Sequence, residues 1–532
     1  MTLIFWIFLV IACIAALNLF AELKRDLMMM QQNSYRIDRY RRWLSASADT
    51  TSWPRLIGMA VFLVSLVAFA DSRWSMGIIA AFAGGNLIAL STRSYKKPLV
   101  WTARAKRIYA MATVLVAIVV ALAVVFGATN PVERCFAGAV AVVGLYCASH
   151  MVMMAAVWLL QPYEKHVNRR YYNDAADILK SMPGLKIIGI TGSFGKTSTK
   201  HYLYRILSEA YQTAMTPGSF NTTLGVIRTV RERLKPYDKV FIVEMGAKQP
   251  GDIKEICDLV HPQIGIVTAV GEQHLESFKS IDNVQRTKFE LVDALPADGL
   301  AVVNNDFPKI ADRPVDNTRC IRYSTNPLDT DAKWHATDIE YTASGTSFTV
   351  VGPDTEIRLT TRLVGDCNIS NLLACVIVAV EMGVPADKIR YAVSKIEQVE
   401  HRLNLKHTPA GITIIDDAFN SNPTGSAMAL DVLSRMKGGK RIVITPGMIE
   451  LGEKTAQLNR EFGVKMARCC DVAIVVGHYN RDAIVAGLKE GALAEDAVIL
   501  ADSCAQAQQL LAGIVKPGDT VLYENDLPDT FK

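Results

Sequence analysis

The sequence predicts an α/β protein whose first third is a group of transmembrane helices and whose remainder forms two domains built on parallel sheets. Three observations predict this. Long apolar runs are confined to residues 1–170, a glycine-containing turn with Gly195, Lys196 and Thr197 opens the next part, and strand-like and helix-like stretches then alternate to the end of the chain. The chain has 532 residues, half of them hydrophobic, and a mean hydropathy of +0.19. Such a value at this length favours membrane segments over a wholly soluble enzyme.

Charge and cysteine usage exclude several classes of protein. Residues 1–170 carry 18 Lys and Arg against seven Asp and Glu, whereas the remainder carries 39 against 45. The positive balance therefore belongs to the apolar part, and we predict no nucleic-acid partner. The ten cysteines include no C-x-x-C pair, which disfavours a disulfide framework and a zinc ribbon.

Five apolar runs in the first part are candidate membrane spans. They lie at residues 3–20, 56–70, 74–90, 108–128 and 136–160. A helix needs about 20 apolar residues to cross a bilayer, and the first, fourth and fifth runs meet this requirement easily. The second run is short and the third is marginal, so these two could instead form one re-entrant hairpin.

The placement of basic residues predicts the orientation of these spans. Sixteen Lys and Arg lie at residues 21–55, 91–107 and 161–170, whereas the alternate loops hold only Arg73 and Arg134. Because basic loops stay in the cytoplasm, we predict about five spans, with the N-terminus outside and the C-terminal part in the cytoplasm. Basic residues follow the first run rather than precede it, which favours an anchor over a cleaved signal peptide.

After residue 170 the pattern changes to alternating strands and helices. Strand-like runs lie at 186–191, 239–244, 264–270 and 300–303. Their alternation with helical stretches predicts a parallel sheet covered by helices. Period-two alternation at 333–364 predicts a few antiparallel strands on one edge. A second alternating series begins near residue 400 and predicts a smaller Rossmann-like domain, so we expect domains at 1–170, 183–399 and 400–532.

The most informative stretch is the turn after the first of these strands. Its residues are Gly192, Ser193, Phe194, Gly195, Lys196, Thr197 and Ser198. In such a turn the backbone N–H groups point at a phosphate, the lysine adds positive charge and the threonine hydroxyl ligates Mg²⁺. The spacing is the short form G-x-x-G-K-T, because Ile190 stands where a full phosphate-loop motif has its first glycine. The strand before it and the helix after it favour a nucleotide site over a chance glycine turn.

The stretch T-G-S-F-G-K-T-S-T-K at 191–200 resembles the phosphate loop of the Mur ligases, ATP-dependent enzymes that join an amino acid or dipeptide to a carboxylate. Further motifs continue the resemblance in order along the chain. They are T-P-G-S-F-N-T-T-L-G-V at 216–226, V-E-M-G-A at 243–247, V-G-E-Q-H-L-E-S-F at 270–278, N-N-D at 304–306, G-D-C-N-I-S-N at 365–371, H-R-L at 401–403, D-A-F-N-S-N-P at 417–423 and G-M-I-E-L-G at 447–452. The resemblance covers about residues 183–525 and is strongest to the members that add D-alanyl-D-alanine.

This resemblance implies roles for residues around the phosphate loop. Lys196 would stabilise the transferred phosphoryl group, and Thr197 and Glu244 would share one Mg²⁺ ion. His274 would bind a second Mg²⁺ ion. Lys288 would be carbamylated, since CO₂ converts its amine into an anion and so reverses the sign of its charge.

Three more residues are implied to contact the nucleotide. Asn304 resembles the asparagine that contacts adenine, and Arg402 and Asp417 resemble the pair that closes onto the phosphates and the ribose. ATP and two Mg²⁺ ions are therefore the expected cofactors.

The resemblance also implies a two-step reaction. A carboxylate of a cell-wall precursor, UDP-linked or lipid-linked, would attack the γ-phosphoryl group of ATP and form an acyl phosphate. The amine of an amino acid or dipeptide, with D-Ala-D-Ala preferred, would then displace phosphate. We expect a multi-pass protein of the bacterial cell membrane with its catalytic domains in the cytoplasm.

The sequence departs from the family pattern where the substrates bind. Cys367 replaces a histidine, Phe419 replaces a tyrosine, and the stretch Y-E-N-D-L-P-D at 523–529 stands where the family has a K-G-S-R-like stretch. The apolar runs also take the place of the family's UDP-substrate domain. We therefore predict ATP activation but not the identity of the acceptor or the amine.

Three alternatives to this interpretation are less well supported by the motifs. One is a membrane-associated poly-γ-glutamate synthase-like ligase, which has a similar phosphate loop but is disfavoured by the E-M-G-A and H-L-E-S-F motifs. Another is a nucleotide-binding membrane transporter or module that is not a ligase, which is disfavoured by the absence of a second nucleotide motif. The third, an amidotransferase-coupled Mur-like subunit, would carry paired zinc cysteines, and this chain has none.

Overall fold

The computed structural model describes residues 3–46, 88, 95, 97–127, 129–342, 345–419 and 421–526. These residues form two compact units that divide at residue 170. The unit before residue 170 is helical, and the unit from residue 170 to residue 526 contains the sheets.

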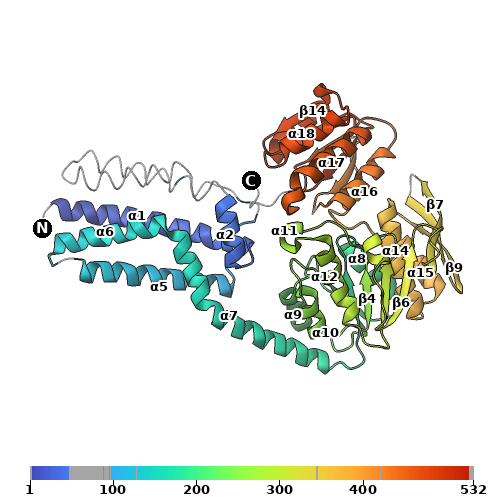
Figure 1. Cartoon of the computed structure of the whole chain (residues 1–532), viewed down its shortest axis with the longest axis horizontal. Coiled ribbons are helices and arrows are strands. Elements are labelled where there is room, and N and C mark those ends of the chain that lie inside the picture. The colour runs from blue at the N-terminus through green and yellow to red at the C-terminus, as the bar shows by residue number, and fades with distance from the viewer. Residues whose placement is uncertain are drawn as a thin grey trace. The chain divides into compact units, whose positions relative to one another are not determined.

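The helices of the first unit pack into a bundle (Figure 1). Helix α1 (Leu3–Gln32) packs along α6 (Pro131–Cys147), and both contact α5 (Ala103–Phe126). The short helix α2 (Ile37–Ala46) follows α1, and α7 (Ser149–Lys180) follows α6. Apolar side chains from these helices form the shared core, among them Leu19, Ile108, Val143 and Met153.

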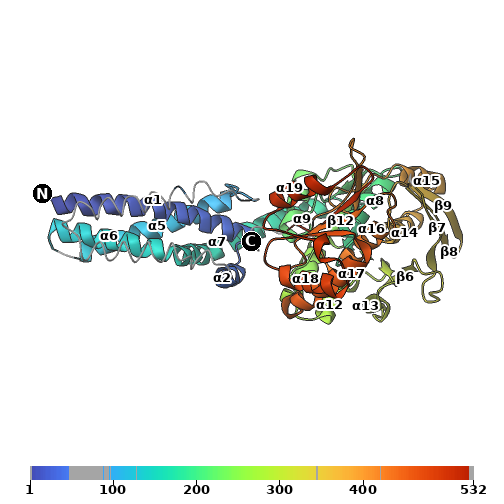
Figure 2. The same cartoon turned by 90° about the horizontal axis from the view of Figure 1, so that it is seen from above.

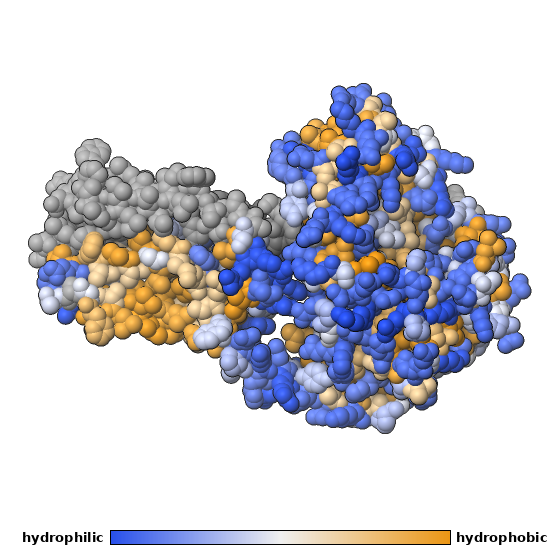
Figure 3. Space-filling view, viewed as in Figure 1, coloured by the Kyte–Doolittle hydropathy of each residue, from blue (hydrophilic) through white to orange (hydrophobic). Residues whose placement is uncertain are grey.

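Among the described residues, α5 is the one helix that is long and apolar enough to cross a membrane. Only 17% of its most apolar window is buried inside the protein. Val114, Leu122 and Phe126 are 51%, 51% and 80% exposed, and Figure 3 shows the hydrophobic surface that covers part of this bundle. An exposed apolar surface of this kind is typical of contact with lipid or protein rather than water.

The span predicted at residues 136–160 is not one continuous helix. Helix α6 ends at Cys147, α7 begins at Ser149, and the two are bent by 79°. Ala148 between them has φ −105° and ψ 23°, outside the helical region. This break was not predictable from the sequence, because neither proline nor glycine stands at residues 147–149. Gly144, a weak helix former, lies a full turn earlier.

The described residues support fewer candidate spans than the number predicted for the whole chain. The described residues contain one such helix, or two if the bent pair α6–α7 counts as one, rather than about five. The predicted span at 3–20 falls within α1 and that at 108–128 overlaps α5. The spans predicted at 56–70 and 74–90 lie outside the described residues, apart from Ile88.

The described part of the second unit contains a nine-stranded sheet and a six-stranded sheet. The order of the larger sheet is β2 (Thr213–Met215), β3 (Val240–Glu244), β1 (Lys186–Thr191), β4 (Ile264–Val267), β5 (Leu300–Asn304), β6 (Arg319–Ser324), β7 (Trp334–Thr342), β8 (Gly345–Gly352) and β9 (Thr355–Thr361). Strands β2 to β7 pair in parallel, and β7, β8 and β9 pair antiparallel. The predicted parallel sheet with an antiparallel edge is thus confirmed.

Helices cover both faces of the larger sheet because its strands are apolar on both sides. One face packs against α8 (Lys196–Leu207), α14 (Asp366–Glu381) and α15 (Ala386–Ser394), with Ile188, Ile242 and Ile266 pointing toward them. The opposite face packs against α9 (Thr223–Glu232), α10 (Asp252–Val260) and α12 (Ile281–Asp293). The phosphate-loop turn leaves the carboxyl end of a strand at the centre of these layers, which is where such folds bind ligands.

The smaller sheet forms the predicted Rossmann-like core. Its order is β10 (Asn404–His407), β11 (Thr413–Asp417), β15 (Thr520–Glu524), β12 (Arg441–Thr445), β13 (Val472–Val476) and β14 (Val498–Ala501), parallel except for β10. Helices α16 (Pro423–Ser434), α17 (Thr455–Cys469) and α18 (Arg481–Glu490) pack on one face, and α19 (Cys504–Ile514) packs on the other (Figure 2).

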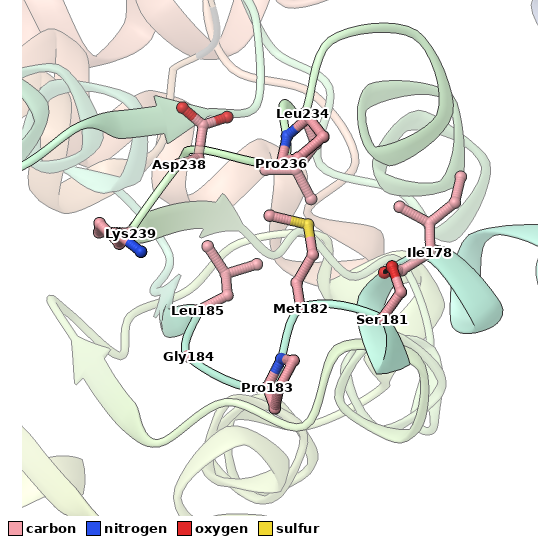
Figure 4. Close-up of a pocket in the computed structure, with 10 residues that line it drawn as sticks. All are labelled: Ile178, Ser181, Met182, Pro183, Gly184, Leu185, Leu234, Pro236, Asp238 and Lys239. Carbon is pink, nitrogen blue, oxygen red and sulfur yellow. Dashed lines mark hydrogen bonds between the residues drawn. The ribbon is translucent and has the colours of Figure 1, made fainter.

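A cavity of about 270 Å³ lies at the amino end of β1, away from the phosphate-loop turn. Residues from the end of α7, the turn into β1 and the segment before β3 line it (Figure 4). Met182 and Leu185 point toward its centre, and Asp238 and Lys239 lie at its side. The carboxylate of Asp238 accepts a hydrogen bond from the backbone N–H of Lys235 at 2.8 Å, so it closes the local turn.

Candidate functional site

The phosphate-loop turn connects β1 to α8 and is tied to the next strand connection. The Ser193 hydroxyl donates to the Gly271 carbonyl at 3.1 Å and accepts from the Gly271 N–H at 3.0 Å. The Thr268 hydroxyl donates to the Phe194 carbonyl. The Phe194 ring meets the Phe307 ring edge-on, with centroids 5.4 Å apart. The turn is therefore held in its shape by contacts within the protein.

Two glycines of the turn have no room for a side chain. A Cβ on Gly195, whose φ is +81°, would lie 2.5 Å from Oδ1 of Asn371. A Cβ on Gly192 would lie 2.0 Å from Oγ1 of Thr268. The positive φ of Gly195 at the start of α8 also favours glycine over any other residue.

Lys196 is the first residue of α8, and its side chain bends back over the turn. Its Nζ donates to the Gly192 carbonyl at 2.6 Å. Burial lowers the pKa of Lys196 to about 8, although the carboxylate of Glu244 acts in the opposite direction. A cation beside the turn is the arrangement that binds phosphate.

Glu244 ends the buried strand β3 beside the turn. Its Oε1 accepts from the Thr197 hydroxyl at 3.2 Å and from the Asn221 amide at 3.0 Å, and its backbone N–H donates to the Thr216 hydroxyl at 3.1 Å. Burial raises the pKa of Glu244, but the nearby ammonium groups of Lys200 and Lys196 outweigh it, so the pKa is lowered. Glu244 is thus a carboxylate ready to accept a cation.

Sequence reasoning missed Lys200. Its Nζ lies 2.9 Å from Oε2 of Glu244 and also donates to the Gly218 carbonyl. Both side chains are buried, with exposures of 0% for Lys200 and 1% for Glu244. Lys200 therefore joins Glu244 to the 216–221 segment. The signal was its position four residues after Lys196, because residues i and i+4 lie on the same face of a helix.

His274 meets a residue from the smaller-sheet domain. Its Nδ1 contacts Oε2 of Glu450, and the Glu276 N–H donates to the Glu450 carbonyl at 3.1 Å. Burial lowers the pKa of His274, although Glu450 opposes this shift. His274 is thus predominantly neutral at its buried position, and the structure records no contact between it and the Thr197–Glu244 pair within the described residues.

Lys288 lies on α12 and is almost fully buried, with 2% exposure. In the part of the chain that the structure describes, its ammonium group has no hydrogen bond or ion pair. Burial lowers the pKa of Lys288 far below its usual value, and the charge of Lys196 lowers it further. A buried amine without a partner favours its neutral form, which is the form that reacts with CO₂.

Asn304, at the end of β5, is held on all sides by the protein. Its amide Nδ2 donates to the Thr268 carbonyl and to the Ser370 hydroxyl, both at 2.9 Å, and its Oδ1 accepts from the Asp306 N–H at 3.1 Å. An amide contact to adenine would have to replace one of the first two bonds.

Arg402 and Asp417 lie together at the edge of the smaller sheet. The guanidinium of Arg402 stacks 3.9 Å above the Phe419 ring, and the Leu403 N–H donates to Oδ1 of Asp417 at 3.0 Å. Burial raises the pKa of Asp417 to about 6, with Arg402 acting in the opposite direction. Burial lowers the pKa of Arg402, and the carboxylates of Asp417 and Glu244 act in the opposite direction.

Glu524 lies beside Asp417 in the paired strands β15 and β11. Its Oε1 accepts from the hydroxyls of Ser421 and Ser426 at 2.6 and 2.9 Å, while Oε2 is buried without a hydrogen bond among the described residues. Burial raises the pKa of Glu524 from 4.5 to about 8, and Asp417 adds to this shift.

We expect Glu524→Gln to reduce the loss of stability as the pH rises. Between about pH 4.5 and 8 the unfolded chain releases the Glu524 proton and the folded chain keeps it, so wild-type stability falls with pH in this window. As the pH increases from about 5 to 8, the melting temperature of the variant should rise relative to that of the wild type. Thermal unfolding of both proteins would measure this, with exposed Glu495→Gln as the control. A difference in melting temperature between the two proteins that stayed constant over this pH range would contradict the prediction.

The structure thus brings Lys196, Thr197 and Glu244 together at one turn, and the charges of Arg402 and Lys196 act on each other, as do those of Lys196 and Lys288. Among the described residues there is no group of three or more His, Cys, Asp or Glu side chains placed to hold a metal. The oxygens of Thr197 and Glu244 nevertheless suit Mg²⁺, which usually binds one or two carboxylates and completes its coordination with substrate phosphates and water.

Comparisons with known proteins agree with this geometry. Residues 190–379 match the Mur ligase middle domain, and residues 401–523 match the glutamate ligase domain of the Mur ligases.

Relatives that carry the name UDP-N-acetylmuramoyl-tripeptide–D-alanyl-D-alanine ligase include proteins from Mycobacterium tuberculosis and Bacillus subtilis. The one from Mycobacterium tuberculosis is 32% identical over 364 residues, which cover 64% of this chain and 70% of the relative. The one from Bacillus subtilis is 27% identical over 281 residues, which cover 53% of this chain and 60% of the relative. The chain thus spans about 60% to 70% of the length of these two relatives.

A solved structure shares the fold. The MurF ligase from Thermotoga maritima, in complex with ADP, aligns with 67% of this chain and 80% of its own chain, with a TM-score of 0.61 and 24% identity. This structure confirms the predicted middle and C-terminal α/β folds. The family matches and the relatives support the prediction of a ligase. The chain belongs to the Mur ligase family.

Proposed function

We propose that this chain is an ATP-dependent ligase that activates a carboxylate of a cell-wall precursor and joins it to the amine of D-alanyl-D-alanine. The main support is the phosphate-loop turn, where Lys196, Thr197 and Glu244 converge at the carboxyl end of a buried parallel strand. The relatives that carry the D-alanyl-D-alanine ligase name support this choice of amine.

In the first step an oxygen of the substrate carboxylate attacks the γ-phosphorus of ATP. A new P–O bond forms, the bond from that phosphorus to the bridging oxygen breaks, and ADP leaves. The turn's N–H groups and the N-terminus of α8 would hold the phosphates, and the ammonium of Lys196 would stabilise charge on the transferred group. Arg402 would approach the phosphates from the smaller-sheet domain, and Asp417 and Asn304 would contact the nucleoside.

In the second step the amine nitrogen attacks the carbonyl carbon of the acyl phosphate. The C–N bond forms, phosphate leaves with the electrons of the C–O bond, and the nitrogen releases a proton. Water would hydrolyse the acyl phosphate, so the two domains must exclude it during the reaction.

Mg²⁺ suits the oxygens beside the turn. Thr197 and Glu244 would hold one ion, and His274 with a carbamylated Lys288 would hold a second. Bound Mg²⁺ would neutralise charge on the transferring oxygens. The unpartnered, buried amine of Lys288 supports its carbamylation, because the modification needs a neutral amine.

We also propose that the chain has three parts, a membrane part at residues 1–170, an ATP-binding domain at 183–399 and a C-terminal domain at 400–532. The basic residues that flank the apolar runs support a multi-pass arrangement with the ligase domains in the cytoplasm. Because the membrane part stands where the relatives hold a UDP-linked substrate, the acceptor is a lipid-linked precursor presented at the inner leaflet.

The test of function is incubation of the purified full chain with ATP, Mg²⁺, D-Ala-D-Ala and UDP-linked or lipid-linked acceptors. Mass spectrometry should detect an acceptor extended by the dipeptide, together with ADP and phosphate. ADP formation that needs no amine would contradict a ligase. The lipid-linked acceptor would be discarded if the fragment 183–532 used a UDP-linked tripeptide as efficiently as the full chain.

We expect the full chain to stay in the membrane fraction after washing with alkaline carbonate and to be released by detergent. The apolar surface of α5, with Leu122 and Phe126 exposed, gives the physical reason, since spanning helices resist extraction that frees peripheral proteins. Immunoblotting of the washed membranes would measure this, with a cytoplasmic protein and a known spanning protein as controls. Release by carbonate alone would contradict a spanning segment.

A further inference from the structure

His274 and Glu450 meet from two different domains, and both have unusual backbone conformations. His274 precedes α11 (Leu275–Phe278) in the larger-sheet domain, and Glu450 lies between β12 and α17 in the other domain. Their φ angles are +52° and +61°. Residues other than glycine seldom adopt positive φ, and where they do the strain is often associated with function.

The contact between them fixes which ring nitrogen of His274 carries a hydrogen. An ionised carboxylate can only accept hydrogen bonds, so Nδ1 of His274 must be the donor to Glu450. In a neutral ring this leaves Nε2 with its lone pair free for a ligand. Histidine ligands of metals commonly have this arrangement, in which a carboxylate holds the other ring nitrogen.

The surrounding contacts hold Glu450 against the segment that carries His274. The Glu276 N–H donates to the Glu450 carbonyl at 3.1 Å. Lys454 forms an ion pair with Glu272 at 2.7 Å, and Lys248 lies 3.6 Å from Glu450. The 447–454 segment of one domain thus docks on the 271–279 segment of the other.

We propose that Glu450 is a positioning residue that sets the tautomer and orientation of the His274 ring, so that docking of the C-terminal domain completes a divalent-cation site at His274. This rests on the proposed function, because it takes His274 as a cation ligand. It assigns Glu450 no contact with substrate or metal. The cation site would be fully formed only when the two domains are in contact.

The test measures cation binding directly in the full-length protein. Mn²⁺ replaces Mg²⁺, a non-hydrolysable ATP analogue is present, and the electron paramagnetic resonance signal reports free Mn²⁺. We expect Glu450→Ala to lower the affinity for one of the two Mn²⁺ ions by about 10-fold or more, which is the usual effect of removing such a partner. Glu450→Gln keeps an oxygen that can accept the hydrogen bond from His274, so it should lower the affinity for this ion less.

Lys454→Met provides the matched control, because it removes a neighbouring interdomain contact that does not touch His274. The Mn²⁺ affinity of this variant should lie within about twofold of the wild-type affinity. Such a change is much smaller than the roughly 10-fold loss expected when His274 loses its carboxylate partner. Equal weakening by both variants would show that only domain docking matters and would overturn the role of Glu450. Unchanged binding by Glu450→Ala, in a protein that melts like the wild type, would also overturn it.

Failure of the proposed function would look different. A wild-type protein that bound neither the ATP analogue nor Mn²⁺ would contradict the nucleotide site itself. A wild-type protein that bound both, together with an unaffected Glu450→Ala variant, would contradict only the role of Glu450.

Discussion

Replacing Lys196 with alanine is expected to reduce ADP formation by at least about 100-fold, the usual cost of removing one group that stabilises charge in the transition state. The ammonium group lies on the phosphate-loop turn, 2.6 Å from the Gly192 carbonyl. A steady-state assay of ADP release with saturating amine and acceptor would measure the loss.

The control for this prediction is Lys254→Ala, which removes an exposed lysine whose contact is an ion pair with Asp258 at 2.8 Å. That variant should turn over at the wild-type rate. Both variants should remain folded, because the Lys196 side chain lies at the phosphate-loop turn and is not part of the apolar core. Normal turnover by Lys196→Ala would show that the phosphate-loop assignment is wrong.

Replacing Lys200 with methionine is expected to destabilise the protein by about 3–5 kcal/mol, the cost of leaving one charge of a buried pair without its partner. Lys200 and Glu244 are both buried and lie 2.9 Å apart. Activity should also fall, because Glu244 and the Gly218 carbonyl lose their shared donor. Chemical denaturation of the wild type and the variant would measure the change in unfolding free energy.

The double variant Lys200→Met with Glu244→Gln separates stability from activity. It removes both charges, so it should recover most of the stability that Lys200→Met loses. It should remain inactive, because the carboxylate proposed to hold Mg²⁺ is gone. A double variant as unstable as the single one would contradict the charge-pair explanation.

Much of the fold was predictable because periodicity and order of elements are local properties of the chain. The strongly apolar strands β1, β3, β4 and β5 stand out in the sequence, and so does the alternating stretch that forms β7, β8 and β9. Short strands such as β2 carry too little pattern to be recognised. The bend between α6 and α7 was missed for a related reason, because no residue near Ala148 marks it.

Those residues of the candidate site that lie in sequence motifs could be predicted. Those that act through contacts between distant segments of the chain could not. The turn around Lys196 and the strand end at Glu244 could be recognised from sequence spacing. The partner of His274 could not, because Glu450 lies 176 residues further along the chain and is brought to it by the contact of two domains. The hydrogen bonds from the Asn304 amide to Thr268 and Ser370 likewise depend on how distant segments pack, so they could not be predicted.

The bonds from Ser193 and Thr268 to the phosphate-loop turn have a thermodynamic consequence. Since these bonds, together with the Asn371 side chain against Gly195, already fix the backbone, an arriving triphosphate finds its N–H donors in position. Little conformational entropy is then lost on association, so more of the interaction energy appears as affinity. Nucleotide exchange would accordingly be governed by movement of the Arg402-bearing domain rather than by ordering of the turn.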